Sequence, residues 1–170
     1  MARALIVGCG CRGRELGERL LAEGWAVRGT SRRAEGLGPI EAVGIEAALA
    51  DPDRPGTILE FVNDVAILVL LLGGAAGSAE ELAAIHGPRL ERLMEHLVET
   101  PVRGVLYEGT EEGAEVVQAA ARTWRIPVRT ISPSLSQTPY SKDSDRLAKE
   151  VQALLAGEPK ELNSDTNSGN

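Results

Sequence analysis

Residues 4–13 read Ala4-Leu5-Ile6-Val7-Gly8-Cys9-Gly10-Cys11-Arg12-Gly13, an apolar run that leads directly into a glycine-rich turn. The run is typical of a buried strand, and the segment after the turn has apolar side chains at helical spacing up to Gly24. A further segment, Trp25–Thr30, has the composition of another strand. These residues therefore predict a strand, a glycine turn, a helix and a second strand, the βαβ unit of a parallel sheet.

The glycines of this turn have separate expected roles. Gly8 permits the sharp turn, Gly10 lets a ligand approach the backbone, and Gly13 lets the helix pack close to the strand. The amides and the positive end of the helix dipole at such a turn suit a pyrophosphate. The spacing G-x-G-x-x-G in a βαβ setting thus indicates a dinucleotide site that includes Gly8, Gly10, Cys11, Arg12 and Gly13. The alternative is an ordinary strand-to-helix turn that holds no ligand.

The end of the second expected strand indicates which dinucleotide would bind. An acidic residue about twenty residues beyond the glycine turn holds the ribose 2′-hydroxyl of NAD, whereas a basic residue there accommodates the 2′-phosphate of NADP. This chain has the hydroxyls of Thr30 and Ser31 and the guanidiniums of Arg32 and Arg33 there, and no carboxylate precedes Glu35. Because guanidiniums bind phosphate through charge-assisted hydrogen bonds, we expect NADP rather than NAD. The alternative is a solvated pair of loop arginines.

The composition fits one globular domain. The chain has 170 residues, of which 43% are hydrophobic and 25% charged, which is enough for a real core. We expect one domain over residues 1–156 and a polar, disordered tail over residues 157–170. The net charge of −7 disfavours nucleic acids and anionic membranes as partners. The sequence holds no apolar run as long as a membrane span and opens without a signal-peptide pattern, so a cytoplasmic location is expected.

The few cysteines and histidines do not indicate a metal site. Cys9 and Cys11 are too close together for a zinc site or a thioredoxin-type pair. We interpret both as small buried turn residues, with redox sensing by a thiol near a helix N-terminus as the alternative. His86 and His96 are interpreted as ordinary surface or packing residues.

The rest of the chain continues the alternation of strands and helices. Further strands are expected at residues 43–50, 65–72, 102–107 and 126–131. Helices are expected at residues 55–62, at 78–99 with a break at Gly87-Pro88, at 110–124 and from Asp143 onward, and a loop is expected at 36–39. This order predicts an α/β fold: a doubly wound (Rossmann) parallel sheet of about six strands with helices on both faces, in three α/β/α layers.

Two of the expected helices carry clear apolar faces. In the helix at 110–124, Thr110 is the expected N-cap, and the inward residues are Ala114, Val117, Ala121 and Trp124. In the last helix the apolar stripe consists of Leu147, Val151, Leu154 and Leu155, which could cap the domain or pair with a second copy in a homodimer.

The segments Ile6–Gly10, Arg14–Gly17 and Thr30–Arg33 resemble the short-chain dehydrogenase/reductase superfamily, in particular its atypical members related to NAD-dependent epimerases and dehydratases. The resemblance implies that Asp51 contacts the adenine ring. It also implies that Leu72, Gly73 and Gly74 lie beside the cofactor ribose and that Pro133 lies near the nicotinamide.

The resemblance also shows what this chain lacks. The family uses a tyrosine followed four residues later by a lysine for acid-base work, but Glu111–Gln118 contains neither residue, and Tyr140-Ser141-Lys142 has a different spacing. Thr110 and Glu108 are the remaining catalytic candidates. The expected function is therefore an NADP-dependent oxidoreductase or epimerase-like enzyme with an unknown small-molecule substrate. The main alternative is a non-catalytic protein that senses NADP(H). A ligand-gating domain of a potassium-transport system ranks last, because Arg32 stands where such domains carry an acidic residue.

Overall fold

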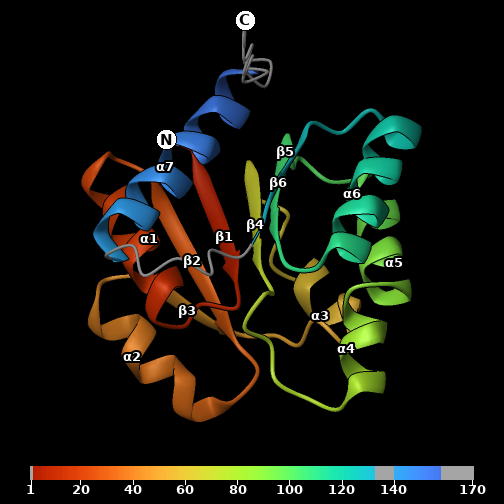
Figure 1. Ribbon diagram of the computed structural model, residues 1–170. Helices are drawn as coiled ribbons and strands as arrows, with labels where there is room; N and C mark the ends of the chain where they lie inside the picture. Colours follow the sequence, from red (N-terminus) through yellow and green to blue (C-terminus); the bar gives the residue numbers. More distant parts are fainter. Residues whose placement is uncertain (1, 133–139, 158–170) are drawn as a thin grey trace, which may run out of the picture.

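Six strands form one parallel sheet in the computed structural model, which describes residues 2–132 and 140–157 (Figure 1). The strand order is β3-β2-β1-β4-β5-β6. The chain therefore builds the sheet outward from β1 to β3, returns to the centre and continues outward through β4, β5 and β6. The strands are β1 (Arg3–Val7), β2 (Ala26–Ser31), β3 (Glu46–Leu49), β4 (Ile67–Leu71), β5 (Gly104–Glu108) and β6 (Val128–Ile131).

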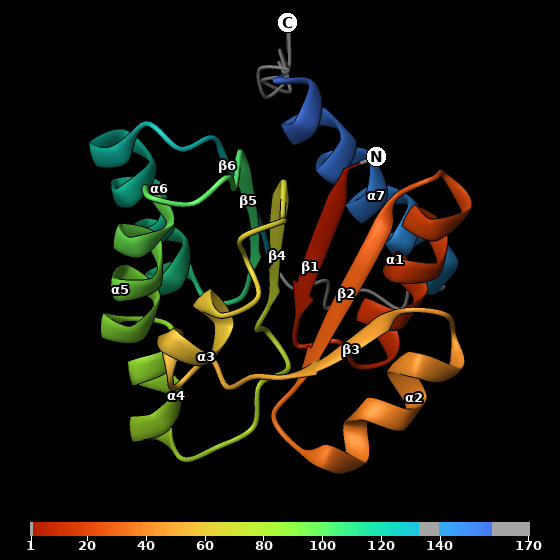
Figure 2. The ribbon, with the colours of Figure 1, turned by 180° about the vertical axis from the view of Figure 1, so that it is seen from behind.

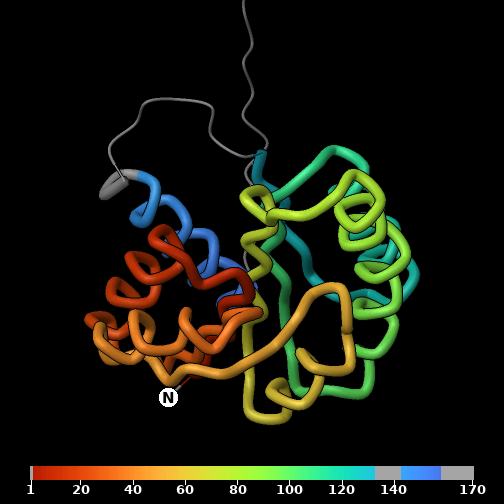
Figure 3. Tube along the Cα trace, turned by 90° about the horizontal axis from the view of Figure 1, so that it is seen from below, coloured from red at the N-terminus to blue at the C-terminus, as the bar shows by residue number. Residues whose placement is uncertain are grey.

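Helices cover both faces of the sheet, which confirms the doubly wound α/β/α expectation (Figures 1 and 2). Seen from below, the two helical layers lie on opposite sides of the sheet (Figure 3). One layer contains α1 (Cys11–Ala22), α2 (Leu37–Ala42) and α7 (Tyr140–Ala156). The other contains α3 (Pro55–Leu59), α4 (Ala79–Ile85), α5 (Pro88–Leu97) and α6 (Glu111–Trp124).

The central strand β4 explains the most apolar segment of the sequence. All five of its residues are buried. Leu68 and Leu70 pack into the core cluster beneath α3, α5 and α6, whereas Ile67, Val69 and Leu71 pack into the cluster beneath α1 and α7. A strand covered on both faces needs apolar side chains at every position, because each face is closed to water.

One departure from the sequence prediction lies between β2 and β3. The expected loop at residues 36–39 instead belongs to a short 3-10 helix, Ala34–Gly36, and to α2. Pro39 falls within the first turn of α2, where its missing amide is tolerated, and the fully buried Ile40 fixes the helix to the core. As a result, β3 begins only at Glu46, whereas the prediction began it at Val43.

Side-chain caps fix the beginnings of two helices, α4 and α6, and the cap of α6 is the one predicted above. The Ser78 hydroxyl accepts a hydrogen bond from the Glu81 amide at 3.1 Å and begins α4, and Pro88 begins α5 after the expected break. The Thr110 hydroxyl accepts from the Gly113 amide at 3.0 Å and begins α6. The expected burial of Trp124 is wrong: it is 42% exposed, because the last turn of α6, residues 122–124, lies beyond the covered part of the helix.

Helix α7 closes the layer beside α1, so the expected role in capping the domain is confirmed (Figure 1). Leu147, Val151 and Leu154 are buried there. The expected tail at residues 157–170 lies outside the described residues from 158 onward. Within the described ranges, no helix is both long and apolar enough to cross a membrane.

Candidate functional site

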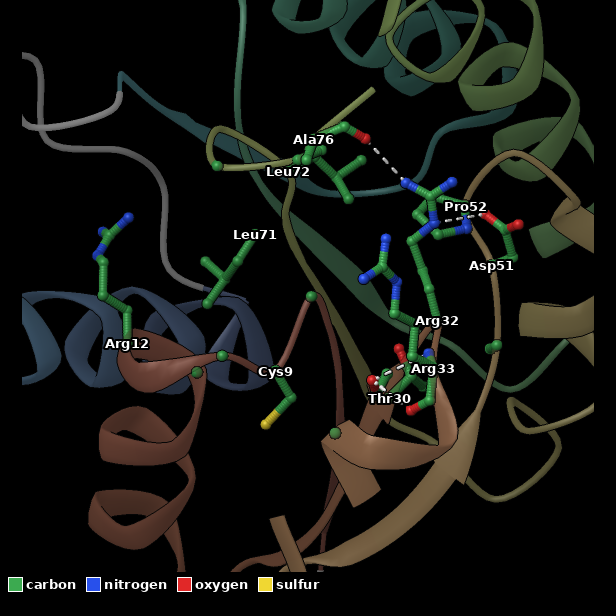
Figure 4. A pocket seen from close by; sticks show the side chains of 18 of the residues that line it. Cys9, Arg12, Thr30, Arg32, Arg33, Asp51, Pro52, Leu71, Leu72 and Ala76 are labelled. Carbon is green, nitrogen blue, oxygen red and sulfur yellow. Dashed lines mark hydrogen bonds and ion pairs between the residues drawn. The ribbon is translucent and has the colours of Figure 1, made fainter. Parts of the chain in front are cut away.

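A cleft of about 1120 Å³ opens at the carboxyl ends of the strands. Its walls are the glycine turn after β1, the end of β2, and the loops after β3 and β4 (Figure 4). Glu108, at the end of β5, also lines the cleft. In open α/β sheets, ligands bind in such a crevice where the strand order reverses, which here is between β1 and β4. The volume slightly exceeds the usual range for small-molecule sites, roughly 300–1,000 Å³, and suits an extended ligand.

Each glycine of the turn has the geometry that its expected role requires. Gly8 has φ +80°, and a Cβ at this position would collide with the Leu71 carbonyl oxygen. A Cβ at Gly10 would have no atom within 4 Å, so this backbone faces open space. A Cβ at Gly13 would lie 3.2 Å from Ile6 Cγ2, which shows how closely α1 packs on β1. The turn therefore presents bare backbone to the cleft while holding the helix against the sheet.

The N-terminus of α1 contributes the electrostatic part of this wall. Gly10 is its N-cap and has no side chain that could satisfy the first helical amides. Amides in the first turn of a helix have no intrahelical acceptor and concentrate positive partial charge. This end of the helix is therefore suited to an anionic group in the cleft.

The arginines after β2 differ in their contacts. Arg32 pairs with Asp51 at 3.2 Å and donates a hydrogen bond to the Ala76 carbonyl oxygen at 3.1 Å, so it links three loops at the cleft (Figure 4). The Ser31 hydroxyl bonds the backbone of Arg33. Among the described residues, the Arg33 guanidinium has no hydrogen-bond or ion-pair partner, although it lines the cleft. This guanidinium is therefore available to an anionic ligand.

Arg12 connects the glycine turn to two distant carboxylates. Its terminal nitrogens donate to both carboxylate oxygens of Glu108, and its Nε donates to Asp143 Oδ2 at 2.7 Å. The hydrogen bonds that Arg12 donates to the Glu108 carboxylate, and in smaller part the one it donates to Asp143, raise the pKa of the Arg12 guanidinium. The three side chains form one cluster, named here the Arg12 cluster, which joins α1, β5 and α7.

The two catalytic candidates have different surroundings. Glu108 lines the cleft but is only 1% exposed, and both of its oxygens accept from Arg12. Thr110 is exposed and uses its hydroxyl to cap α6. It is not among the residues that line the cleft. Glu108 therefore contributes to the lining of the cleft, whereas Thr110 lies outside it.

A buried polar pair lies behind the end of β5. The Tyr107 hydroxyl is 2.7 Å from His86 Nδ1 and accepts a hydrogen bond from the Thr110 amide at 3.0 Å. Burial raises the pKa of Tyr107 and lowers the pKa of His86. The interpretation of His86 as a packing residue is therefore confirmed, with the addition that it supports the start of α6.

The two cysteines of the glycine turn occupy opposite environments. Cys9 is buried, and desolvation raises the pKa of its thiol to about 12. Cys11 is exposed, so the interpretation of both as buried is right for Cys9 and wrong for Cys11. The difference follows from position, because Cys9 points into the core beside Gly29 whereas Cys11 begins α1.

The cleft brings together most of the residues that the sequence predicts for a cofactor. They are Gly8, Gly10, Cys11, Arg12, Gly13, Thr30, Ser31, Arg32, Arg33, Asp51, Leu72 and Gly74. Gly73 is not among the lining residues, and Pro133 lies outside the described residues. The prediction missed Ala76, Glu81 and the partnership of Asp143 with Arg12. No local pattern marks Asp143, because it is 131 positions away from Arg12.

Similarity to known proteins is found at the level of structure. The sequence matches no protein-family model, and no curated protein is significantly similar to it. A short-chain dehydrogenase/reductase superfamily protein from Agrobacterium tumefaciens with bound NAD has a TM-score of 0.59 and 16% identity, over 76% of this chain and 48% of that one.

Two enzymes with stated activities have the same fold. UDP-glucuronic acid 4-epimerase from Bacillus cereus, in complex with NAD, has a TM-score of 0.60 and 13% identity over 75% of this chain and 55% of that one. Triphenylmethane reductase from Citrobacter sp., complexed with NADP(H), has a TM-score of 0.62 and 19% identity over 81% of this chain and 50% of that one. The chain spans about half the length of these structures. The fold is thus the Rossmann fold found in short-chain dehydrogenases/reductases.

Proposed function

We propose that this chain binds NADP(H) in the cleft and serves as an oxidoreductase for a small molecule. The observation that carries the proposal is that the bare backbone at Gly10 and the guanidinium of Arg33, which has no partner within residues 2–132 and 140–157, face one cleft. The first feature suits a pyrophosphate, and the second suits a phosphate on the adenosine ribose. The NAD and NADP(H) complexes of proteins with this fold support a nicotinamide dinucleotide as the ligand.

The residues of the cleft divide between the parts of the cofactor. The turn from Gly8 to Gly13 would hold the pyrophosphate, Arg32 and Arg33 the 2′-phosphate, and Asp51 the adenine side of the cleft. Leu72 and Gly74 would lie beside the second ribose. When bound, the nicotinamide supplies hydride transfer, and the chain supplies binding, orientation and the electrostatic environment.

Asp51 limits how strongly Arg32 can hold a phosphate. Arg32 already has a carboxylate partner at 3.2 Å, so a 2′-phosphate must compete with that partner. Both side chains are about one-third exposed, at 36% and 31%, and an ion pair of this kind contributes only about 0–1 kcal/mol. A doubly charged phosphate can replace it, and we expect Arg33 to provide the larger share of the selectivity.

Titration with NADPH and NADH tests the assignment. We expect NADPH to bind at least about tenfold more tightly, which corresponds to about 1.4 kcal/mol, and Arg32→Ala with Arg33→Ala to remove most of this difference. Arg103→Ala removes an exposed charge outside the cleft and provides the control. Equal affinities in the unmodified protein would refute the preference for NADP, and binding of neither nucleotide would refute the site.

A non-catalytic NADP(H)-sensing protein is the second candidate. It is favoured by the bidentate pairing of Glu108 with Arg12, in which both oxygens of this catalytic candidate already accept a hydrogen bond. NADPH oxidation over a panel of carbonyl compounds separates the two functions. Turnover that Thr110→Val or Glu108→Gln abolishes supports the enzyme, whereas tight binding without turnover across the panel supports the sensor. For either function we expect a cytoplasmic location.

A further inference from the structure

We propose that the Arg12 cluster sets the charge selectivity of the half of the cleft that would hold the nicotinamide and the substrate. Its excess carboxylate favours the oxidised, positively charged nicotinamide and substrates that are neutral or cationic, and it disfavours substrates with a carboxylate or phosphate group. This inference rests on the proposed binding of NADP(H). It assigns a substrate class to the same site.

The composition of the cluster carries the argument. One guanidinium is shared between two carboxylates, those of Glu108 and Asp143, so the cluster has one negative charge in excess. The side chain of Glu108 is 1% exposed and that of Asp143 is 14% exposed. Water therefore screens this charge poorly, and the charge acts on its neighbours more strongly than one at the surface.

The position of the cluster decides which part of a ligand it influences. Figure 4 shows Arg12 on one side of Leu71, with Arg32 and Arg33 on the other. Because the strand order reverses between β1 and β4, a dinucleotide crosses the cleft there, with one half toward β2 and the other toward β5. Arg32 and Arg33 mark the adenosine half, so the Arg12 cluster lies in the nicotinamide half.

The two halves consequently treat anions differently. In the adenosine half the Arg33 guanidinium, which has no ion-pair partner among the described residues, can accept a phosphate. In the nicotinamide half the guanidinium of Arg12 is already engaged by two carboxylates. The excess negative charge would repel an anionic substrate there, because Arg12 is already paired and the cluster offers no other cation. The same charge would attract a cationic ring.

NADP⁺ and NADPH form a natural pair of probes, because they differ by the positive charge of the nicotinamide ring. The variant Asp143→Asn removes the excess charge and keeps the shape of the side chain. We expect the ratio of the NADPH Kd to the NADP⁺ Kd, measured by titration calorimetry, to fall about fivefold in this variant. Asp143→Glu keeps the charge and should restore most of the ratio.

Asp145→Asn is the matched control, because Asp145 lies on the same helix and pairs with an arginine, Arg19, at 3.2 Å. Its side chain is 47% exposed, against 14% for Asp143, so water screens its charge and its removal should leave the ratio unchanged. Adenosine 2′,5′-bisphosphate fills only the adenosine half, and we expect Asp143→Asn to leave its Kd unchanged.

Three outcomes oppose the idea and can be told apart. An unchanged ratio in Asp143→Asn overturns the charge selectivity while leaving the binding site intact. Equal weakening of NADP⁺, NADPH and the bisphosphate shows that Asp143 only maintains the shape of the cleft, which also overturns it. If the unmodified protein binds none of the three probes, the proposed function itself fails.

Discussion

Replacing Gly10 with alanine separates ligand binding from folding. Gly10 has φ −80° and ψ −154°, an extended conformation with negative φ, and its new Cβ would meet no atom within 4 Å. The cost to folding is therefore that of a weaker N-cap, about 1 kcal/mol or less. For a protein of 170 residues, this corresponds to a decrease in Tm of about 2–4 °C.

The same methyl group should interfere strongly with a dinucleotide. It occupies the open space through which a pyrophosphate reaches the backbone amides, and the loss of one hydrogen bond to a charged group costs about 1.5–3 kcal/mol. Gly10→Ala should therefore weaken NADPH binding by roughly tenfold to a hundredfold, measured by calorimetry beside thermal unfolding. Gly38→Ala, also with no atom within 4 Å, lies outside the cleft and should leave the Kd unchanged. An unaltered Kd in Gly10→Ala would refute the proposed approach of the pyrophosphate.

Three further predictions concern reactivity and stability. Iodoacetamide should alkylate Cys11 in the folded protein and spare Cys9, whose buried thiol has a pKa of about 12, and NADPH should slow the reaction; mass spectrometry showing equal labelling would contradict this. Burial lowers the pKa of His86, so the unfolded state takes up the proton first as the pH falls below about 6.5, and the free energy of unfolding decreases by up to about 1.4 kcal/mol per pH unit. In denaturant titrations, the free energy of unfolding should decrease less steeply with falling pH in His86→Gln than in the unmodified protein. His96→Gln should retain the full decrease, and identical slopes in all three proteins would exclude the effect. Thr110→Ala should lower the free energy of unfolding by about 1 kcal/mol because the cap of α6 is lost, whereas Thr110→Ser should nearly preserve it.

Patterns within a few residues of each other predict the local structure of this chain correctly. The glycine turn, the apolar strand β4 and the cap at Thr110 all depend on neighbours along the chain. Backbone conformation, hydrogen bonding in a helix turn and alternation along a strand act over such short separations. These features therefore predicted the order of elements and the location of the cleft.

The sequence predictions are wrong where burial depends on packing between elements or on where a helix extends past the sheet. Gly36 and Pro39 suggested a loop, but packing of Ile40 stabilises a helix there. Trp124 has the correct spacing for the inner face of α6, yet the sheet does not cover that last turn. Helical spacing predicts which residues share a face, but it does not show how far the covering layer extends.

The surroundings of Arg12 show most clearly what the local sequence determines and what only the tertiary structure determines. Its place in a glycine turn between a strand and a helix, and the prediction that this turn binds an anion, follow from the local sequence alone, because a short segment is enough to set these elements. Its partners, Glu108 and Asp143, are 96 and 131 positions away. They meet Arg12 only because the strand order returns to the centre of the sheet before β5 and because the apolar face of α7 packs beside α1. Contacts at such separations depend on the packing of whole elements, which no local pattern encodes.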